Sequence, residues 1–497
     1  MLAAAGAAAV GAAAGNLFAR SVRTKGSAPK NVVFIISDAL RADRLGCYGG
    51  HSGRLTRFDD LTPELDRLAR QGVLFERCIA PSSWTLQSMG AIMSSRLPFI
   101  EGDEYNEGYA PREIPTLAEA FSNAGYETIA FMSNPWLCLR DAARKKDPVA
   151  ARGFASWNVI STDMVPNPMY VNKTGERMVY DHFVRAGDMM KRAIAALQAR
   201  RHDPRPFFMY VHLMDTHEPY NPPPRYKAQC LVPPRNNVPD FMLYQCLRWA
   251  GIVSGREEIP PKDMDLFRRA RSLYNASVRY VDDSVGAFIE YLAETGLDDN
   301  TLLVFSADHG EEFQEHGWVG HSRTLYEESL HVPLIFYGAD AAADARMSDQ
   351  VSGLDIAPTI LAACGIGAPG GMAGRALPLS GSDNREPLPA ISALVKPCQP
   401  GGFNENIFAT SDPRGIKLIR YEFLGSKAGT PPRDELFDRR ADPAEQTDIS
   451  QARTSTVAAL GKELQLLRDT HKAGITESIT IDEATRRQLK ALGYLGG

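Results

Sequence analysis

Short runs of apolar residues recur along the chain, and longer stretches with helical spacing of apolar positions separate them. The run Asn31–Ser37 is apolar at nearly every position, which is typical of a strand buried on both faces of a sheet. Met264–Thr295 has the pattern of a long amphipathic helix. Four more strands are predicted on the same grounds, at Thr128–Met132, Phe207–Leu213, Thr301–Phe305 and Val332–Tyr337.

This alternation of strands and helices predicts the α/β class, with a large mixed, mostly parallel sheet sandwiched by helices. The chain has 497 residues, which suits one large domain with a smaller companion. We assign the large domain to residues 31–380. A polar segment begins at Ser380, and the pattern after it predicts a small C-terminal α+β subdomain, with a small antiparallel sheet and a helix, over residues 381–497.

Residues 1–30 are set apart from the fold as a leader. The run Leu2–Ala14 is apolar but too short for a membrane span, and the basic residues follow it instead of preceding it. This pattern predicts a weak export signal or a disordered segment, and it leaves membrane association through the N-terminus open. A periplasmic or extracellular location is slightly favoured over a cytoplasmic one.

Composition narrows the range of partners. The formal net charge is -5 and no long basic run occurs, so we expect no nucleic acid partner. None of the seven cysteines belongs to a CxxC pair, which argues against a zinc–thiolate site. The oligomeric state is left open by the sequence.

Charged and imidazole side chains gather where three of the predicted strands end. Asp38 follows the first strand, His212 and His217 lie at the end of another, and Asp308-His309 follow a third. Ligands of mostly parallel sheets bind beyond the carboxyl ends of the strands. Five of the ten histidines fall at two of these ends, the other two being His316 and His321. We therefore expect one metal site, built on Asp38, Asp308 and His309.

Thr85 precedes an apolar helical run. A hydroxyl at this position is most simply a helix N-cap. A helix N-terminus also favours anions, and a nearby cation would lower the pKa of the hydroxyl and make it a nucleophile. The two roles do not exclude each other.

Several longer stretches resemble the sulfatase-like branch of the alkaline phosphatase superfamily. In that comparison Asp38 matches the first metal carboxylate, Asp308 and His309 match the second carboxylate and its neighbour, and Thr85 takes the nucleophile position. The resemblance implies one divalent metal, calcium, magnesium or manganese, with zinc also compatible, held by these four residues. The stretches that carry it are NVVFIISDALRADRLGCYG, SLYNASVRYVDDSVGAFIEYL, TLLVFSADHGEEFQEHG, LYEESLHVPLIFYG, VSGLDIAPTILAACGI with GRALP, and ELFDRRADPAEQTDIS.

The chain also departs from the sulfatase pattern. Sulfatases carry Cys or Ser in a C/S-x-P-x-R motif that is oxidised to formylglycine, whereas this chain has Thr85–Met89 (TLQSM) there. Ala39 replaces the second of two paired aspartates, Asn134 lies where a Lys-x-His is expected, and His321 replaces a lysine. The residues that do match, Asp38, Thr85, Asp308 and His309, resemble the site of the threonine-dependent phosphotransferases of the superfamily, such as lipoteichoic-acid synthase and phosphoethanolamine transferases.

This resemblance implies that Thr85 attacks phosphorus and that water or an acceptor alcohol then releases the product. His217 and His321 would bind the oxygens of the anion or protonate the leaving group, and Asn134 and His212 would contact the substrate. A second metal is not expected, because it would need a further aspartate and two more histidines.

The preferred hypothesis is a metal-dependent hydrolase or transferase of phosphate-type esters, that is, of a phosphodiester, phosphomonoester or phosphonate. One alternative is a sulfatase without formylglycine, and another is a pseudoenzyme that binds glycan or lipid. The expected partner is an anionic ester substrate that is linked to a glycan or a lipid. Its specificity is expected from loops at residues 96–112 and 220–262.

Overall fold

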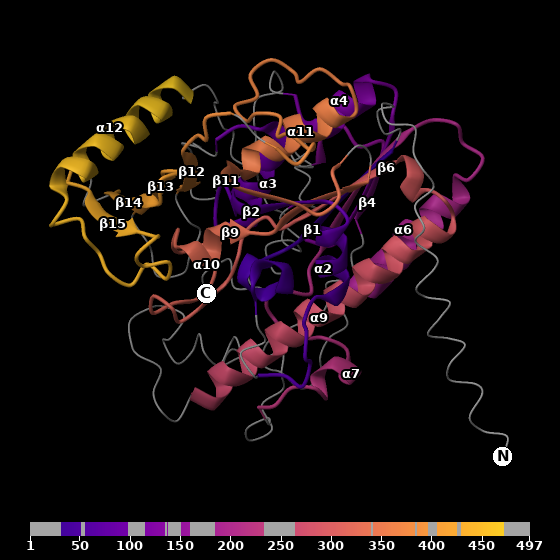
Figure 1. Cartoon of the computed structure of the whole chain (residues 1–497), viewed down its shortest axis with the longest axis horizontal. Coiled ribbons are helices and arrows are strands. Elements are labelled where there is room, and N and C mark those ends of the chain that lie inside the picture. Colours follow the sequence, from indigo (N-terminus) through magenta and orange to yellow (C-terminus); the bar gives the residue numbers. More distant parts are fainter. Residues whose placement is uncertain are drawn as a thin grey trace, which may run out of the picture.

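A nine-stranded sheet forms the centre of the described part of the protein (Figure 1). In spatial order, eight of its strands are β11 (Ala345–Ser352), β2 (Val73–Ile79), β10 (Leu334–Gly338), β6 (Thr301–Ser306), β1 (Asn31–Ser37), β5 (Phe207–Leu213), β3 (Glu127–Met132) and β4 (Ser156–Val159); the ninth, β9 (His331–Val332), pairs with β2. The computed structural model describes residues 31–50, 55–97, 115–134, 137, 151–159, 184–232, 264–338, 341–382, 385–395, 405–424 and 429–471.

Most neighbouring strands in this sheet are parallel. β1 pairs in parallel with β5 and β6, and β3 does so with β5 and β4. β10 runs antiparallel to both β6 and β2. The predicted mixed, mostly parallel sheet is therefore confirmed.

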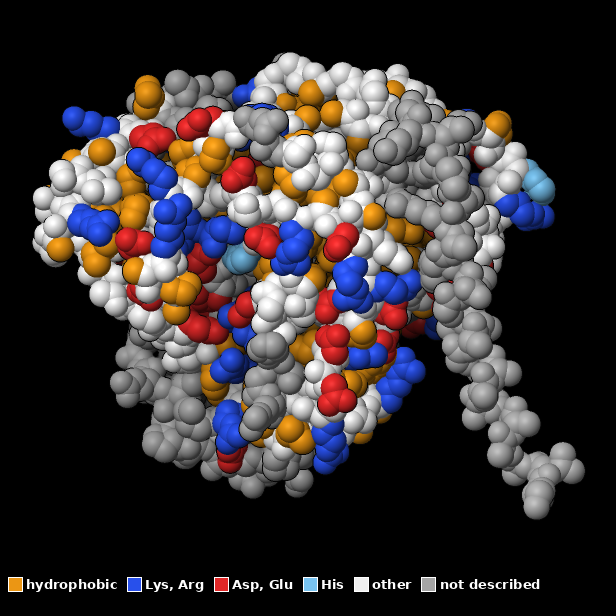
Figure 2. Space-filling view, in the orientation of Figure 1, with side chains coloured by type: hydrophobic (Ala, Val, Ile, Leu, Met, Phe, Trp, Pro, Cys, Tyr) orange, Lys and Arg blue, Asp and Glu red, His pale blue; other side chains and the backbone are white. Residues whose placement is uncertain are grey.

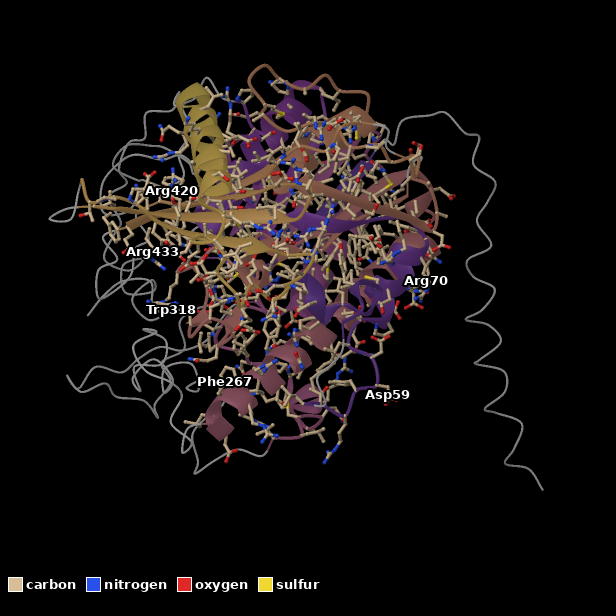
Figure 3. All side chains as sticks on the ribbon, turned by 60° about the vertical axis from the view of Figure 1, so that its left-hand side comes forward. Asp59, Arg70, Phe267, Trp318, Arg420 and Arg433 are labelled. Atoms are coloured by element: carbon tan, nitrogen blue, oxygen red, sulfur yellow. The ribbon has the colours of Figure 1, made fainter. Side chains whose placement is uncertain are left out.

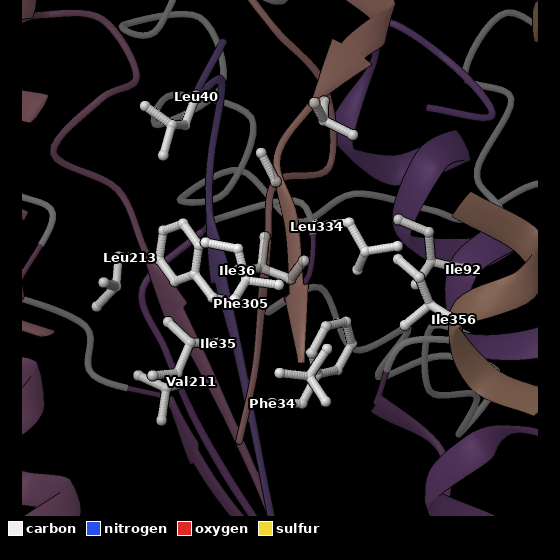
Figure 4. Packing of buried hydrophobic residues seen from close by; sticks show 14 of the residues in the cluster. Phe34, Ile35, Ile36, Leu40, Ile92, Val211, Leu213, Phe305, Leu334 and Ile356 are labelled. Atoms are coloured by element: carbon white, nitrogen blue, oxygen red, sulfur yellow. The ribbon is translucent and has the colours of Figure 1, made fainter. Parts of the chain in front are cut away.

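β1 is fully buried because its residues face helices on both sides of the sheet. Val32, Val33, Phe34, Ile35 and Ile36 have no exposed surface, and most of their neighbours on β5 and β6 are also buried and apolar (Figure 4). Burying each such side chain contributes about 1.5–3 kcal/mol, which explains why an uninterrupted apolar run forms the central strand.

Two groups of helices cover the sheet. α3 (Thr85–Ser94), α4 (Leu117–Asn123) and α11 (Ile356–Ala363) contact one another on one face. α2 (Pro63–Arg70), α6 (Ala186–Ala199) and α9 (Met264–Glu294) pack together on the other face, as Figure 1 shows. Among the described residues, no helix has the length and apolar character that a membrane crossing requires.

Several strands of the main sheet differ from the sequence pattern, including β4, which was not predicted. The predicted strand Val332–Tyr337 is divided at Pro333, which has no N–H for a ladder hydrogen bond, into β9 and β10. β2 and β11 were not predicted, because their sequences VLFERCI and ARMSDQVS mix polar with apolar residues.

The C-terminal region forms a four-stranded antiparallel sheet covered by a helix, which confirms the predicted small subdomain. The strands β12 (Ala390–Leu394), β13 (Glu405–Ser411), β14 (Ile416–Phe423) and β15 (Arg433–Asp438) pair in chain order, and α12 spans Thr454–His471. Alternate residues face opposite sides. Ile407 and Ile419 join the main core, whereas Phe408 and Leu418 pack in small clusters with leucines of α12.

Charged side chains of both signs are interspersed on the molecular surface seen in Figure 2. Figure 3 places Arg420 and Arg433 on the C-terminal sheet and Phe267 near the start of α9. Arg420 pairs with Asp434 on the adjacent strand at 2.8 Å, so this sheet also carries cross-strand ion pairs.

One buried carboxylate ties α9 to the start of α2. The side chain of Asp282 accepts hydrogen bonds from the backbone N–H groups of Leu65 (2.8 Å) and Glu64 (3.1 Å). Asp282 and Leu65 are fully buried, and the carboxylate takes the place of the missing helix turn as the acceptor of these two helix-terminal N–H groups.

We expect Asp282→Ala to lower the free energy of unfolding by about 2–4 kcal/mol, because two buried N–H groups lose their acceptor. The urea midpoint and the melting temperature of the full chain measure the loss. Glu290→Ala, at an exposed position of the same helix, is the control and should change stability by less than about 0.5 kcal/mol. Equal losses in the two variants would contradict the assignment.

Candidate active site

The site lies where β1, β5 and β6 end side by side. Ile36 is in register with His212 on β5 and with Ser306 on β6, so the carboxyl ends of the three strands are level. Asp38 directly follows β1, and Asp308 comes two residues after β6. All of these side chains are fully buried. Strands that are distant in sequence therefore deliver their polar residues to one edge of the sheet.

Asp38 is held by side chains from three other segments. Its Oδ2 accepts hydrogen bonds from Asn134 Nδ2 at 2.7 Å and from His212 Nε2 at 2.9 Å, and Thr85 Oγ1 lies at 3.4 Å. His212 Nδ1 is 2.6 Å from the Tyr210 hydroxyl, which donates to it and leaves Nε2–H for Asp38. Burial opposes ionisation of Asp38, but His217, His212 and His309 outweigh it and hold the pKa of Asp38 well below its usual range.

Three hydrogen-bond acceptors face one another at this point: Asp38 Oδ1, Asp308 Oδ2 and His309 Nε2. His309 Nδ1 donates to the carbonyl of Gly310 at 2.9 Å, so its Nε2 carries the lone pair. That nitrogen lies 3.6 Å from Asp38 Oδ1 and 3.5 Å from Asp308 Oδ2. Within the described part of the chain, neither of these two buried oxygens has a hydrogen-bond partner.

This arrangement fits a divalent cation. Buried acceptors that face one another without a donor are unfavourable unless a positive charge lies between them. Carboxylate oxygens and an imidazole nitrogen suit magnesium, calcium, manganese or zinc. Burial and the neighbouring Asp38 carboxylate raise the pKa of Asp308, as expected for two carboxylates that share one site before a cation is bound.

Thr85 is the first residue of α3 and faces the same atoms. Its Oγ1 lies 3.1 Å from His309 Nε2. The next turn of the helix is anchored to the same strand end, because Ser88 Oγ donates to the carbonyl of Asp308 at 2.6 Å. The helix N-terminus, with its free N–H groups, is thus fixed next to the candidate cation site.

A second group of buried residues borders His309. The ring of His321 lies 4.5 Å from that of His309 and 4.7 Å from that of His217, measured between centroids. Glu311 accepts from His321 Nδ1 at 2.9 Å and from the Tyr220 hydroxyl at 2.8 Å. His217, Glu218 and His321 place ligand atoms within 4.8 Å of one another and form another group that could hold a cation.

The two histidines of this group differ in charge. Burial opposes protonation of His217, but Glu218, Asp38 and Glu311 raise its pKa to about 9. Burial, with His309 and His217 adding to it, lowers the pKa of His321 to about 3 despite the nearby Glu218 carboxylate. Near neutral pH, His217 is therefore a proton donor and His321 a neutral imidazole.

All of the site residues predicted from the sequence lie together. The set comprises Asp38, Thr85, Asn134, His212, His217, Asp308, His309 and His321. Their contacts refine the expected roles without testing them: both ring nitrogens of His212 are used inside the protein, and Asn134 donates to Asp38. Asp215 points elsewhere, since its carboxylate accepts from the backbone N–H of Ala186 at 2.7 Å, at the start of α6.

Four further residues border the site and were not predicted from the sequence: Tyr210, Glu218, Tyr220 and Glu311. Glu311 follows the Asp-His-Gly turn directly, and this position in the motif was the one available signal. Residues 98–114 and 233–263, which make up most of the two loops expected to set specificity, lie outside the described residues.

The fold and this site define an ester hydrolase of the alkaline phosphatase superfamily. Residues 30–366 match the sulfatase family model, and the chain belongs to the sulfatase family.

Relatives and solved structures agree with this assignment. An ulvan-active sulfatase from Formosa agariphila is 24% identical over 431 residues, which cover 84% of this chain and 76% of that protein. An N-acetylglucosamine-6-O-sulfatase from Bacteroides thetaiotaomicron is 23% identical over 513 residues, covering 89% and 86%.

Two solved structures show the same fold. A phosphonate monoester hydrolase from Silicibacter pomeroyi superposes with a TM-score of 0.66 at 21% identity and covers 92% of this chain and 100% of its own. A protein solved in complex with its substrate D-glucosamine-2-N,6-O-disulfate gives a TM-score of 0.65 at 21% identity, covering 90% and 98%.

Removing either carboxylate that faces His309 should weaken cation binding. We expect Asp38→Asn and Asp308→Asn each to lower the affinity for a divalent cation by at least about 100-fold, because the amide carries no negative charge. Titration calorimetry with manganese or zinc measures the change. Asp66→Asn is the control, since this buried carboxylate lies in another part of the chain and accepts from Cys47 N–H. Unchanged affinity in both site variants would exclude this cation site.

Proposed function

We propose that the protein hydrolyses an anionic ester carried by a glycan, with Thr85 as the nucleophile and a sulfate ester as the first candidate. The observation that carries the proposal is the position of Thr85 Oγ1, 3.1 Å from His309 Nε2 and 3.4 Å from Asp38 Oδ2 at the N-terminus of α3. The names of the relatives, which act on ulvan and on sulfated N-acetylglucosamine, support sulfate and a glycan.

The charge of the site supports an oxyanion substrate only together with a cation. Asp38, Asp308, Glu218 and Glu311 surround the nucleophile region, and by themselves they would repel an anion. Asp38, Thr85, Asp308 and His309 would hold the cation. When bound, it supplies electrostatic stabilisation of the ester oxygens and lowers the pKa of the nearby hydroxyl.

The residues of the chain account for the remaining proton and bond changes. Thr85 Oγ1 forms a bond to the central sulfur or phosphorus atom while the bond to the leaving oxygen breaks. The hydroxyl proton of Thr85 passes to Asp38 Oδ2, which lies 3.4 Å away, because His309 Nε2 would be a ligand of the cation. His217 is protonated near neutral pH and donates a proton to the leaving oxygen. Water then attacks the sulfur or phosphorus atom and gives a proton to His217, the bond to Thr85 Oγ1 breaks, and Asp38 returns the proton to this oxygen.

The supporting residues have separate tasks in this scheme. His212 and Asn134 orient Asp38, because each donates to the same carboxylate oxygen. Glu311 accepts from His321 Nδ1, which directs the other ring nitrogen of this neutral imidazole away from Glu311. The lone pair of His321 therefore lies on Nε2, and we assign His321 to accepting a hydrogen bond from the attacking water or from a glycan hydroxyl, with Glu311 positioning His321.

A phosphate-type ester is the second candidate, and the chemistry of Thr85 favours it. Oxidation of a threonine hydroxyl gives a ketone and not the aldehyde that formylglycine chemistry needs. A simple hydroxyl nucleophile attached to a helix N-terminus is well suited to phosphoryl transfer, in which positioning and charge stabilisation dominate. The shared fold with a phosphonate monoester hydrolase is compatible with this alternative.

Replacement of the nucleophile should abolish turnover while the protein stays folded. We expect Thr85→Ala to lower kcat by at least about 1000-fold, because the covalent step has no other hydroxyl in its place. Thr85→Ser should retain partial activity. Thr410→Ala, a change of a buried threonine on β13, is the matched control and should keep the activity of the unaltered protein. Full activity of Thr85→Ala would refute the nucleophile assignment.

A substrate panel decides between sulfur and phosphorus. We expect kcat/KM for 4-nitrophenyl sulfate and for 6-O-sulfated N-acetylglucosamine to exceed that for 4-nitrophenyl phosphate, bis(4-nitrophenyl) phosphate and phenylphosphonate esters by at least about tenfold. Release of 4-nitrophenol and of inorganic sulfate or phosphate measures the rates. The reverse order would establish the phosphate-type ester as the substrate class and overturn the first candidate.

A further inference from the structure

A separate cluster of buried ionisable side chains lies beyond the Asp308-His309 turn. Glu312 is on β7 (Glu312–Phe313), His316 is in the turn that follows, and Glu328 is on α10 (Glu327–Leu330). Ligand atoms of these three residues all lie within 4.8 Å of one another. Glu312 and Glu328 are buried, and His316 is half-buried. None of the three takes part in the chemistry proposed for Thr85.

Both ring nitrogens of His316 lie against oxygen acceptors. His316 Nε2 lies 3.1 Å from the carbonyl oxygen of Glu445, to which it can only donate. The side-chain amide of Gln446 also approaches Nε2, but it donates to the carbonyls of Glu315 and Ala444. Nδ1 lies 2.5 Å from Glu328 Oε1, so a second proton lies between them. Burial opposes protonation, but Glu328 and Glu445 raise the pKa of His316, as expected when a proton takes the place of a bound cation.

Glu312 provides a second unsatisfied group. Its Oε1 accepts from the hydroxyl of Thr324, whereas its Oε2 is buried with no hydrogen-bond partner in the described ranges. Arg41 is the nearby cation, but its guanidinium is engaged by Asp43, by Glu315 and by the carbonyl of Glu311. Burial and the Glu328 carboxylate raise the pKa of Glu312 well above its usual range, as expected for an acid that lacks a positive partner.

We propose that Glu312, His316 and Glu328 bind a second divalent cation of the zinc or manganese type. Two carboxylates and one imidazole are the ligands that these ions prefer, and three protein ligands leave positions for water. The hydrogen bond from His316 Nε2 to a carbonyl is the arrangement that orients a ligating histidine. The cation would displace the proton on His316 Nδ1, the Nδ1 and Glu328 Oε1 atoms would separate to about 3 Å, and the ion would offset the charge of Glu312.

The role of this cation is structural support of the active-site loop. The backbone N–H groups of Gly310 and Glu311 donate to the carbonyls of Ser329 and Glu328 on α10, at 2.8 and 3.0 Å. A cation on Glu328 and Glu312 would therefore fix the segment that carries His309 and Glu311. In Figure 3, Trp318 marks this turn between the C-terminal sheet at Arg433 and the start of α9 at Phe267.

Anomalous diffraction tests the site without altering the protein. Crystals of the full chain grown with zinc or manganese chloride should give, at the absorption edge of the added metal, a peak enclosed by Glu312, His316 and Glu328. This peak is expected in addition to the one at Asp38 and Asp308. A peak at the Asp38 site with none at Glu312 would overturn the proposal and identify a proton as the link between His316 and Glu328.

Metal content of variants gives an independent measurement. Elemental analysis after zinc loading and gel filtration should find one ion fewer per chain in Glu312→Gln than in the unaltered protein. Glu315→Gln is the matched control, because it makes the same change three residues away in a carboxylate that pairs with Arg41, and it should keep the full content. Asp38→Asn should lose the other ion and retain a zinc-dependent rise in melting temperature. That rise should vanish in Asp38→Asn/Glu312→Gln; equal metal content in Glu312→Gln and Glu315→Gln would refute the site.

Discussion

The level ends of β1, β5 and β6 are the constraint on which the active-site arrangement depends. Parallel pairing in this register places Asp38, His212 and Asp308 at one edge of the sheet, and the surrounding apolar core removes all three from water. Two buried carboxylates and an imidazole lone pair then face one another. Such a cluster is costly unless hydrogen bonds and a cation compensate for its charge. Asn134 and His212 offset part of this cost by donating to Asp38, and α3 places its N-terminus beside the carboxylates.

The parts of the fold that the sequence predicted are those in which burial alone determines the residue pattern. Asn31–Ser37 and Phe207–Leu213 were predicted with their observed bounds, because a central strand must be apolar on both faces. β11 is an edge strand of the sheet and β2 lies next to it, and they include residues such as Glu76 and Asp349 that face solvent in part. Their mixture of polar and apolar residues carries no signal strong enough to separate them from loops.

The candidate site divides in a similar way. Asp38, Asp308 and His309 come within three residues of the end of an apolar strand. Their position and their metal-binding side chains therefore both predicted a site. Tyr210 and Glu218 could not be recognised, because their importance comes from the partner that folding brings to them and not from their neighbours in sequence. Asp215 shows that a carboxylate at a strand end can serve the fold instead: it lies in the same turn as His217, but it accepts from the backbone N–H of Ala186 at the start of α6.

The balance of charge links the nucleophile to its surroundings and limits what the site can do. His217 carries a proton because three carboxylates lie near it, whereas His321 is kept neutral by burial and by two neighbouring imidazoles. A site with several carboxylates can accept an anionic ester only if enough positive charge is bound to offset them. The same reasoning applies to the carboxylates of Glu312 and Glu328. Glu328 is on α10, whose backbone carbonyls accept from the N–H groups that follow His309. If both clusters hold a cation, the loop from His309 to His321 is fixed at its beginning and its middle.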